Sequence, residues 1–172
     1  MSVDERMVHD IVQKVMANMQ ISGSVSGMHG VFKDMNDAIN ASIEAQKKVC
    51  TMTLDQREQI ISLIRKKTHE NAEILANMGV NETGMGNVGD KILKHHLTAD
   101  KVPGTEDIST IAWSGDRGLT LVEMGPFGVI GAITPATNPS ETVICNCIGM
   151  LAGGNTVVFN PHPNAKKTTI YT

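Results

Sequence analysis

Two short polar segments of this chain have the residue types of a small-ligand site. The first reads Thr134-Pro-Ala-Thr-Asn138, and the second reads Asn160-Pro-His-Pro163. Their small side chains leave room for a ligand, and their prolines stiffen the loops because the ring fixes φ. Asn138 directly precedes a helical pattern, and the free N–H groups at a helix start suit an oxyanion or a phosphate. The residues alone leave a second interpretation open, in which Asn138 only caps the helix and the prolines only form turns.

Each polar segment follows a short apolar run that is typical of a buried strand. Residues 129–134 read VIGAIT, and residues 156–159 read TVVF before Asn160-Pro161 should end that strand. A helical pattern lies between the runs, so the order predicts a right-handed strand–helix–strand unit with parallel strands. Ligands of open parallel sheets bind beyond the carboxyl ends of the strands. We therefore expect both polar segments to lie at one edge and to form one site.

The helix between the strands has clear start and stop signals. Asn138 is the candidate N-cap, Pro139 suits the first helical position, and Glu141 stands in the capping-box position. Apolar residues continue to Ala152, and Gly153-Gly154 should end the helix. The pattern predicts a helix whose first turn lies beside the polar loops.

Cys145 and Cys147 lie within this predicted helix. They are two residues apart, so they face different directions. No cationic residue adjoins them in sequence to lower a thiol pKa. We expect both to be buried small apolar residues rather than nucleophiles.

Two further motifs fit structural roles better than ligand sites. Residues 84–89 match G-x-G-x-x-G, but the residues before them are helical in pattern, whereas a dinucleotide fingerprint must follow a strand. A helix–helix loop is predicted instead. His95 and His96 are adjacent in a helical stretch over 90–99, so they point to different faces. With no other ligand at metal spacing, the sequence predicts no metal site.

Composition excludes several classes of function. The 172 residues carry a net charge of -3, which does not favour nucleic-acid binding. No run reaches the roughly 20 apolar residues that span a bilayer. Acidic residues near the start, Asp4 and Glu5 among them, interrupt any secretory signal. The cysteines do not suggest a disulfide framework, so we expect a cytoplasmic setting.

Two amphipathic helices are predicted over residues 32–50 and 54–78. Ile39, Ile43 and Ala45 should face inward from the first. Thr53 and Gln56 form a capping box at the start of the second. The Arg65-Lys66-Lys67 run should be a solvated face. The expected inward residues of the second helix are Ile60, Ile61, Leu63, Ile64, Ile74 and Leu75.

The remaining segments flank these elements. Residues 102–116 should be an irregular connection, and residues 119–124 a strand that forms a β-arm or an edge. Residues 164–172 should begin the next crossover helix. Residues 1–20 form an amphipathic pattern, and residues 21–30 a Gly/Ser-rich flexible linker, which together suit docking into a partner.

The chain resembles the N-terminal part of the aldehyde dehydrogenase superfamily, in collinear order over nearly its whole length. The similarity is greatest to the CoA-acylating propionaldehyde and acetaldehyde dehydrogenases of bacterial microcompartments. The segments that carry the resemblance are ITPATNPSET, MLAGGNTVVFNPHPNAKK, Asn81-Glu-Thr-Gly-Met-Gly-Asn87, Asp90-Lys91, Pro103-Gly104 and Gly125-Pro-Phe-Gly-Val-Ile-Gly131. The resemblance implies an α/β fold: helices, a β-arm and one parallel βαβ unit of a Rossmann-type domain.

The family reaction implied by the resemblance is oxidation of a short-chain aldehyde with NAD and coenzyme A to an acyl-CoA. A cysteine thiolate attacks the aldehyde, hydride passes to NAD, and CoA takes the acyl group. Asn138 matches the family asparagine whose amide meets the developing oxyanion, a use that competes with helix capping. The residues that match the nucleotide-cleft loops are Ile133, Thr134, Pro135, Ala136, Thr137, Asn160, Pro161, His162 and Pro163.

The Asn160-Pro-His-Pro163 loop departs from many superfamily members, which read Lys-Pro-Ser-Glu there. The lysine and glutamate of those members help hold the adenosine ribose. Their absence matches the CoA-acylating branch, and it leaves open how NAD is distinguished from NADP.

The resemblance also implies an organisation into parts. Residues 1–20 are similar to peptides that target enzymes to a microcompartment shell, and residues 31–172 match an incomplete NAD- and CoA-binding domain. The β-arm implies homo-oligomer contacts in the full-length protein. We expect the chain to be a fragment that is inactive alone, because the family's nucleophilic cysteine lies downstream. The alternative is a non-catalytic nucleotide-binding or microcompartment-targeting module.

Overall fold

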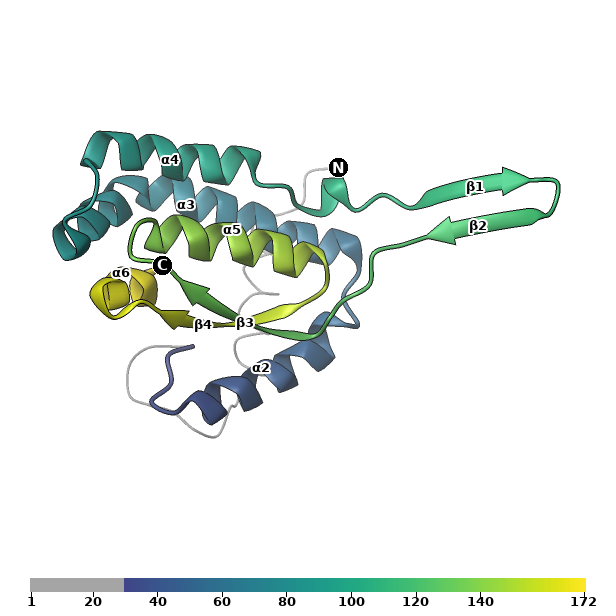
Figure 1. Cartoon of the computed structure of the whole chain (residues 1–172), viewed down its shortest axis with the longest axis horizontal. Coiled ribbons are helices and arrows are strands. Elements are labelled where there is room, and N and C mark those ends of the chain that lie inside the picture. The colour runs from purple at the N-terminus through teal and green to yellow at the C-terminus, as the bar shows by residue number, and fades with distance from the viewer. Residues whose placement is uncertain (1–29) are drawn as a thin grey trace, which may run out of the picture.

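The structure, a computed structural model, describes residues 30–172. The predicted targeting segment 1–20 and all but the last residue of the linker 21–30 lie outside the described residues. The fold is α/β, with two parallel strands between one helix on one face and the remaining α-helices on the other side (Figure 1). No helix in the described part is long and apolar enough to cross a membrane.

The predicted strand–helix–strand unit is confirmed. Strand β3 (Val129–Thr134), helix α5 (Pro139–Ala152) and strand β4 (Thr156–Pro161) follow in that order, and the strands pair in parallel from Val129↔Thr156 to Thr134↔Pro161. Pro139 occupies the start of α5, and Gly154 turns the chain with a φ of 79° after the helix ends. The side chain of Asn155 accepts hydrogen bonds from the backbone N–H groups of Phe127 and Gly128, which ties the start of β3 to the start of β4.

One boundary of this unit is wrong in the sequence analysis. Asn160-Pro161 does not end β4, because both residues pair with Ile133 and Thr134. A proline cannot donate to a strand ladder, but it is tolerated at the end of an edge strand. Within residues 30–172 β4 pairs with β3 alone, and Pro161 is its last residue.

Helices α3 (Leu54–Thr83) and α4 (Val88–Lys101) form a helical hairpin. The predicted capping box is present, since Gln56 N donates to Thr53 Oγ1 over 3.2 Å and Thr53 N donates to Gln56 Oε1 over 3.0 Å. The glycine-rich stretch is the predicted loop between the helices. Gly84 ends α3 with a φ of 67°, which a residue with a side chain adopts at a cost.

Helix α3 packs against α5 to form the core. Its buried cluster joins Ile61 and Leu75 of α3 to Ile144, Ile148 and Ala152 of α5. The expected inward positions Leu63 and Ile74 are wrong, because these side chains are 37% and 46% exposed. The residues of α3 that pack against α5 are Ile61 and Leu75, and Leu63 and Ile74 lie outside this buried cluster.

Helix α2 (Met35–Val49) packs on the other face of the strands through polar residues. Ser42 Oγ donates to Thr156 Oγ1 over 2.9 Å. The side chain of Gln46 donates through Nε2 to Gly154 O and accepts through Oε1 from Thr156 N. The expectation that Ile39 and Ile43 face inward is wrong, since both are exposed. These hydrogen bonds to the start of β4 turn the polar side of α2 toward the sheet.

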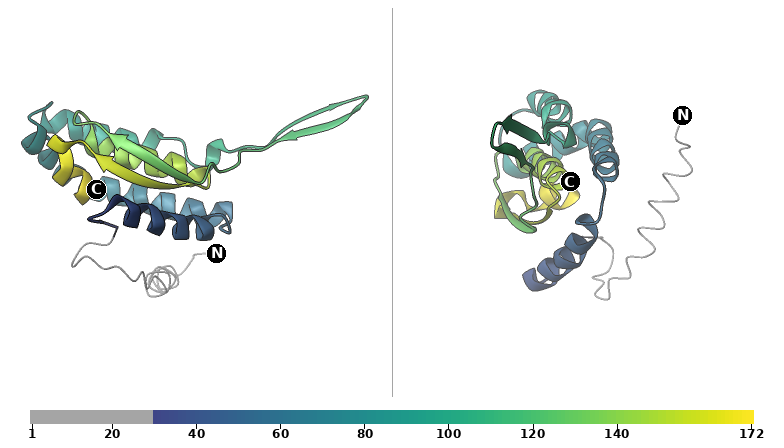
Figure 2. Two further views of the ribbon diagram at one scale, coloured as in Figure 1. Left: turned by 60° about the horizontal axis from the view of Figure 1, so that its bottom comes forward. Right: turned by 90° about the vertical axis from the view of Figure 1, so that its right-hand side faces the viewer.

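The predicted β-arm is present and contains one more strand than expected. Strands β1 (Ile111–Gly115) and β2 (Gly118–Val122) form an antiparallel hairpin whose residues are all exposed. The left view of Figure 2 shows the hairpin extending away from the helices. Residues 111–115 were expected to be irregular, because Ile-Ala-Trp-Ser-Gly is too short to display a clear alternation.

The connection after α4 and the C-terminal segment after β4 both hold helices together. Arg65 is not part of a solvated face as expected: its guanidinium donates to Ala99 O and Val102 O and pairs with Glu106 beside the short helix η1 (Thr105–Asp107). At the C-terminal end, η2 (Pro163–Ala165) and α6 (Lys166–Tyr171) form the predicted start of a helix. The Glu82 carboxylate accepts from the first N–H groups of α6.

Candidate active site

The register of β3 and β4 brings the two predicted loops together. Thr134 pairs with Pro161, so the segments that follow, 135–138 and 162–163, leave the same edge of the sheet. Side chains alternate along a strand, and the predicted residues therefore divide between two faces. Ile133 is 83% exposed on one face, whereas Thr134 is 1% exposed on the other. In loop 135–137, Ala136 is buried and Pro135 and Thr137 are exposed.

The hydroxyl of Thr134 lies at the carboxyl end of β3. It is buried, and no residue within 30–172 makes a hydrogen bond to its Oγ1. A buried hydroxyl without a partner costs about 1–3 kcal/mol. Its position therefore suits a bound polar group or an ordered water that completes the site.

Asn138 stands at the cap position of α5 but does not cap the helix. Its side chain makes no capping hydrogen bond, and its Oδ1 accepts from Lys94 Nζ over 3.3 Å. An ammonium group can only donate, so this contact assigns the amide: oxygen toward Lys94 and NH2 away from it. Within the described residues the NH2 group has no hydrogen-bond acceptor. The side-chain NH2 can therefore donate to a ligand at the carboxyl end of β3.

The predicted capping box at Glu141 is wrong. The carboxylate does not return to the Asn138 backbone but turns inward, where Oε1 lies 3.4 Å from Lys91 Nζ and Oε2 lies 3.1 Å from Ser140 Oγ. Both charged residues are buried, with exposures of 3% for Lys91 and 7% for Glu141. A buried charge needs an opposite charge and hydrogen bonds, and these long-range partners outweigh a local cap.

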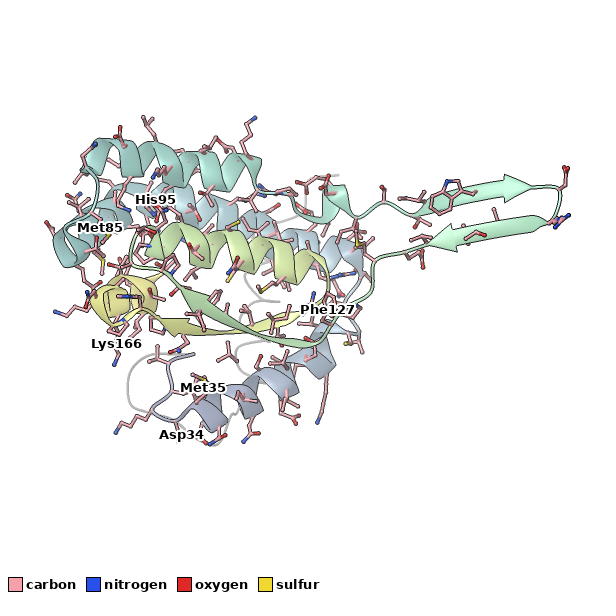
Figure 3. All side chains as sticks on the ribbon, in the orientation of Figure 1. Asp34, Met35, Met85, His95, Phe127 and Lys166 are labelled. Atoms are coloured by element: carbon pink, nitrogen blue, oxygen red, sulfur yellow. The ribbon has the colours of Figure 1, made fainter. Side chains whose placement is uncertain are left out.

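His95 extends this buried network between α4 and α5. Its Nδ1 lies 2.7 Å from Lys91 O and its Nε2 lies 2.7 Å from Ser140 Oγ (His95 is labelled in Figure 3). A carbonyl only accepts, so Nδ1 carries the proton, and in the neutral ring Nε2 accepts from the Ser140 hydroxyl. The single proton of that hydroxyl then points to His95 over the shorter distance rather than to Glu141 Oε2. Burial lowers the pKa of His95, although the nearby Glu141 charge acts in the opposite direction. The ring is a neutral structural link, and it faces away from His96 as predicted.

A groove of about 310 Å³ runs between α4 and α5 beside Asn138. Leu97 and Val102 contribute apolar surface, while Lys94 and Asn138 lie at its polar end. Cys145 also lines this groove and is exposed, so the expectation that it is buried is wrong. Burial raises the pKa of the Cys147 thiol to about 11, which keeps it protonated and unsuited to nucleophilic attack.

The second loop contributes a different surface. Asn160, His162 and Pro163 are exposed, and His162 Nδ1 accepts from Asn164 N over 3.1 Å to cap η2. Among residues 30–172, no cluster of three or more His, Cys, Asp or Glu side chains could hold a metal ion.

Sequence reasoning missed the roles of Lys91, Lys94 and Glu141. Lys91 appeared only as part of the resemblance, and Glu141 was assigned to a cap. A lysine on one helix finds its glutamate 50 positions away, and no local spacing encodes that separation. The sequence indicated these roles only in that the face of α4 that carries His95 also carries other polar residues.

Comparisons with known proteins identify the family of the chain. The model of the aldehyde dehydrogenase family matches residues 14–172. The chain belongs to this family. It is 47% identical to an acetylating acetaldehyde dehydrogenase of Bilophila wadsworthia over 96% of the chain and 36% of that protein. It is 45% identical to a CoA-propanoylating propanal dehydrogenase of Salmonella typhimurium over 82% of the chain and 30% of that protein.

Solved structures extend the comparison. A propionaldehyde dehydrogenase from the fucose-utilisation microcompartment of Clostridium phytofermentans is 76% identical, with a TM-score of 0.80 over 83% of this chain and 33% of that one. A propionaldehyde dehydrogenase of Rhodopseudomonas palustris, solved with bound propionyl-CoA, is 49% identical, with a TM-score of 0.79 over 83% and 32%. The 172 residues thus span about a third of the length of these relatives and match the N-terminal portion of CoA-acylating aldehyde dehydrogenases.

Proposed function

We propose that this chain supplies the N-terminal, cofactor-binding part of an enzyme that oxidises a short-chain aldehyde with NAD and coenzyme A to an acyl-CoA. The relatives support the reaction class, since proteins that match nearly the whole chain are named acetylating or CoA-propanoylating dehydrogenases. The observation that carries the proposal is the Asn138 side chain. It does not cap α5, and its NH2 group is directed away from Lys94 at the carboxyl edge of a parallel sheet.

The residues at this edge fit a nicotinamide dinucleotide and CoA. The fit is supported by the adjacent loops that follow β3 and β4 and by the buried Thr134 hydroxyl, which has no partner within residues 30–172. Residues 133–137 and 160–163 would line the cleft. When bound, NAD accepts the hydride and CoA accepts the acyl group. Related structures contain bound propionyl-CoA and, in an engineered glycolyl-CoA reductase, bound NADP+.

In this proposal Asn138 is the catalytic residue of the chain. Its NH2 group donates to the aldehyde oxygen as negative charge develops there. A donor already held in place is worth more than one that must reorganise, because the protein has met the cost of orienting it during folding. The groove between α4 and α5 would take the short alkyl group, since Leu97 and Val102 give it apolar surface.

The test is made on the full-length gene product that contains these residues. Propionaldehyde-dependent reduction of NAD with CoA present should be observed, and Asn138→Asp should lower kcat by about 10²- to 10³-fold. The aspartate has the same shape but replaces the donor with an acceptor. Asn77→Asp is the matched control, since Asn77 lies on the exposed side of α3 and donates only to Glu73 O. Unchanged kcat in Asn138→Asp would contradict the oxyanion role.

We further propose that the 172-residue chain alone has no turnover, that residues 1–20 direct the protein to a microcompartment shell, and that the full-length protein is a homo-oligomer. The proposal of a microcompartment setting draws on the Clostridium phytofermentans relative, whose description places it there. Deletion of residues 1–20 should abolish co-purification with shell proteins while leaving kcat unchanged. Retained co-purification would contradict the targeting role.

A further inference from the structure

Helix α4 holds the first turn of α5 at separate points. Lys91 Nζ donates to Thr137 O over 2.9 Å, Lys94 Nζ donates to Asn138 Oδ1 over 3.3 Å, and His95 Nε2 contacts Ser140 Oγ over 2.7 Å. Lys94 and His95 lie three and four positions after Lys91, so both lie on the same side of α4 as Lys91. One side of one helix thus contacts the residue before the proposed oxyanion donor, the donor itself and the residue two positions after it.

The Lys91 contact acts on the backbone rather than on a side chain. The carbonyl of Thr137 belongs to the same planar peptide unit as the N–H of Asn138. A donor that fixes the direction of this carbonyl therefore fixes the plane from which the Asn138 side chain departs. Lys91 is 3% exposed, and Glu141 contacts the same ammonium group, so the donor itself has little freedom to move.

Stability alone is a weak reason to bury this pair. Removing two charges from water costs several kcal/mol per ion, and apolar residues of similar volume often stabilise a protein as well or better. The pair is nevertheless nearly inaccessible to solvent, and the one other acceptor of Lys91 within the described residues is the carbonyl before Asn138. The arrangement is suited to orientation.

We infer that Lys91, held by Glu141, is a positioning residue for Asn138: it orients the Thr137–Asn138 peptide so that the amide NH2 lies where the aldehyde oxygen becomes charged. This inference rests on the proposed function. Lys94 adds the second constraint, since it holds the amide oxygen and thereby sets which way the NH2 group points.

The test is a double-mutant cycle in the full-length gene product. The paired variant K91M/E141Q removes both charges, leaves no uncompensated buried ion and keeps a side chain of similar length at each position. In the parent it should lower the single-turnover rate of NADH formation by about 10- to 100-fold, because a misplaced group costs up to about 10²-fold. The KM for CoA should stay unchanged. In the Asn138→Asp background the same pair should have less than about a twofold effect, since coupled positions are not additive.

Arg57 provides the matched control for a purely structural role. Its guanidinium donates to Ala152 O and so holds the opposite end of α5. Arg57→Met should lower the Tm of the protein but should leave the single-turnover rate unchanged. A variant that changes the Tm equally in the parent and in the Asn138→Asp protein, but changes the rate only in the parent, acts by positioning Asn138 and not by destabilising the fold.

The outcomes distinguish the two proposals. If K91M/E141Q lowers the rate equally in the parent and in Asn138→Asp, or leaves the parent rate unchanged, the positioning role is overturned and the oxyanion role stands. If Asn138→Asp itself retains the full rate, the proposed function of Asn138 fails, and the positioning role fails with it.

Discussion

The contact between α4 and α5 and the β1–β2 arm solve opposite physical problems. Between α4 and α5, ionisable side chains are buried: Lys91, His95 and Glu141 are each at most 7% exposed. In the arm, apolar side chains are exposed: Trp113 and Leu121 are 58% and 60% accessible, and Figure 3 labels Phe127, 96% accessible, at the base of the arm. A buried charge is tolerated only with partners at fixed distances, so such a region defines geometry. An exposed apolar hairpin defines no internal geometry, and its exposed apolar surface is the reason that we propose it as an oligomer contact.

The largest expected effect comes from breaking the buried ion pair on one side only. Lys91→Met leaves Glu141 as a buried charge without its ammonium partner, which should destabilise the protein by about 3–5 kcal/mol. The paired variant K91M/E141Q should be much closer to the parent. Thermal unfolding of the parent and both variants, measured side by side, makes the comparison. Equal losses in the single and paired variants would mean that the charges do not interact as described.

An intermediate effect should appear as the pH falls. Burial lowers the pKa of His95 in the folded protein, despite the opposing charge of Glu141, so the unfolded chain takes up the proton first. The contribution of His95 to stability is fully present above about pH 6.5 and is lost progressively as the pH falls through its folded pKa. The Tm should therefore decline between pH 7 and 5, and His95→Gln should reduce that slope.

His96→Gln provides the control for the pH experiment. His96 lies on the other face of α4, where its ring contacts His69 rather than the buried network. This variant should keep the pH slope that His95→Gln reduces. A slope that survives His95→Gln unchanged would assign the pH dependence to other groups.

The smallest effect on stability should come from the arm. Leu121→Ala should change the free energy of unfolding by less than about 0.5 kcal/mol, as expected of an exposed position without internal contacts. Ile148→Ala in the core, a truncation of similar size, should cost about 2–5 kcal/mol.

A polar substitution in the arm, Leu121→Ser, should instead alter self-association if the full-length protein is a homo-oligomer. Sedimentation of Leu121→Ser at several protein concentrations should show a shift toward smaller species. An unchanged distribution would remove this position from the proposed oligomer contact. The arm variants and the Lys91 and Glu141 variants together test whether the arm serves assembly and the α4–α5 contact serves geometry.

The features that could be predicted from sequence are those with local causes. The strands and helix of the βαβ unit follow from apolar runs punctuated by Pro139, Gly153 and Gly154, and the Thr53 cap follows from a four-residue pattern. The glycine-rich loop was separated from a dinucleotide fingerprint by the helix before it. The side-by-side position of the two candidate loops also follows from the parallel order of the strands.

The features that could not be predicted depend on partners distant in sequence. Asn138 and Glu141 have the spacing of a cap, yet α4 supplies Lys94 and Lys91 and turns both side chains to other uses. Ile39 and Ile43 have the spacing of a core face, yet the strand edge selects Ser42 and Gln46. In each case a buried polar group required a partner, and that requirement outweighed the local pattern.

The sequence by itself therefore determined the order of elements, the Thr53 capping box and the edge at which the candidate site lies, because these depend on residues within a few positions of one another. Only the tertiary structure decided which way Asn138 points and what holds it there. The physical reason is that Lys91 and Glu141, 50 positions apart, lose their hydration together and must satisfy one another and the Thr137 carbonyl.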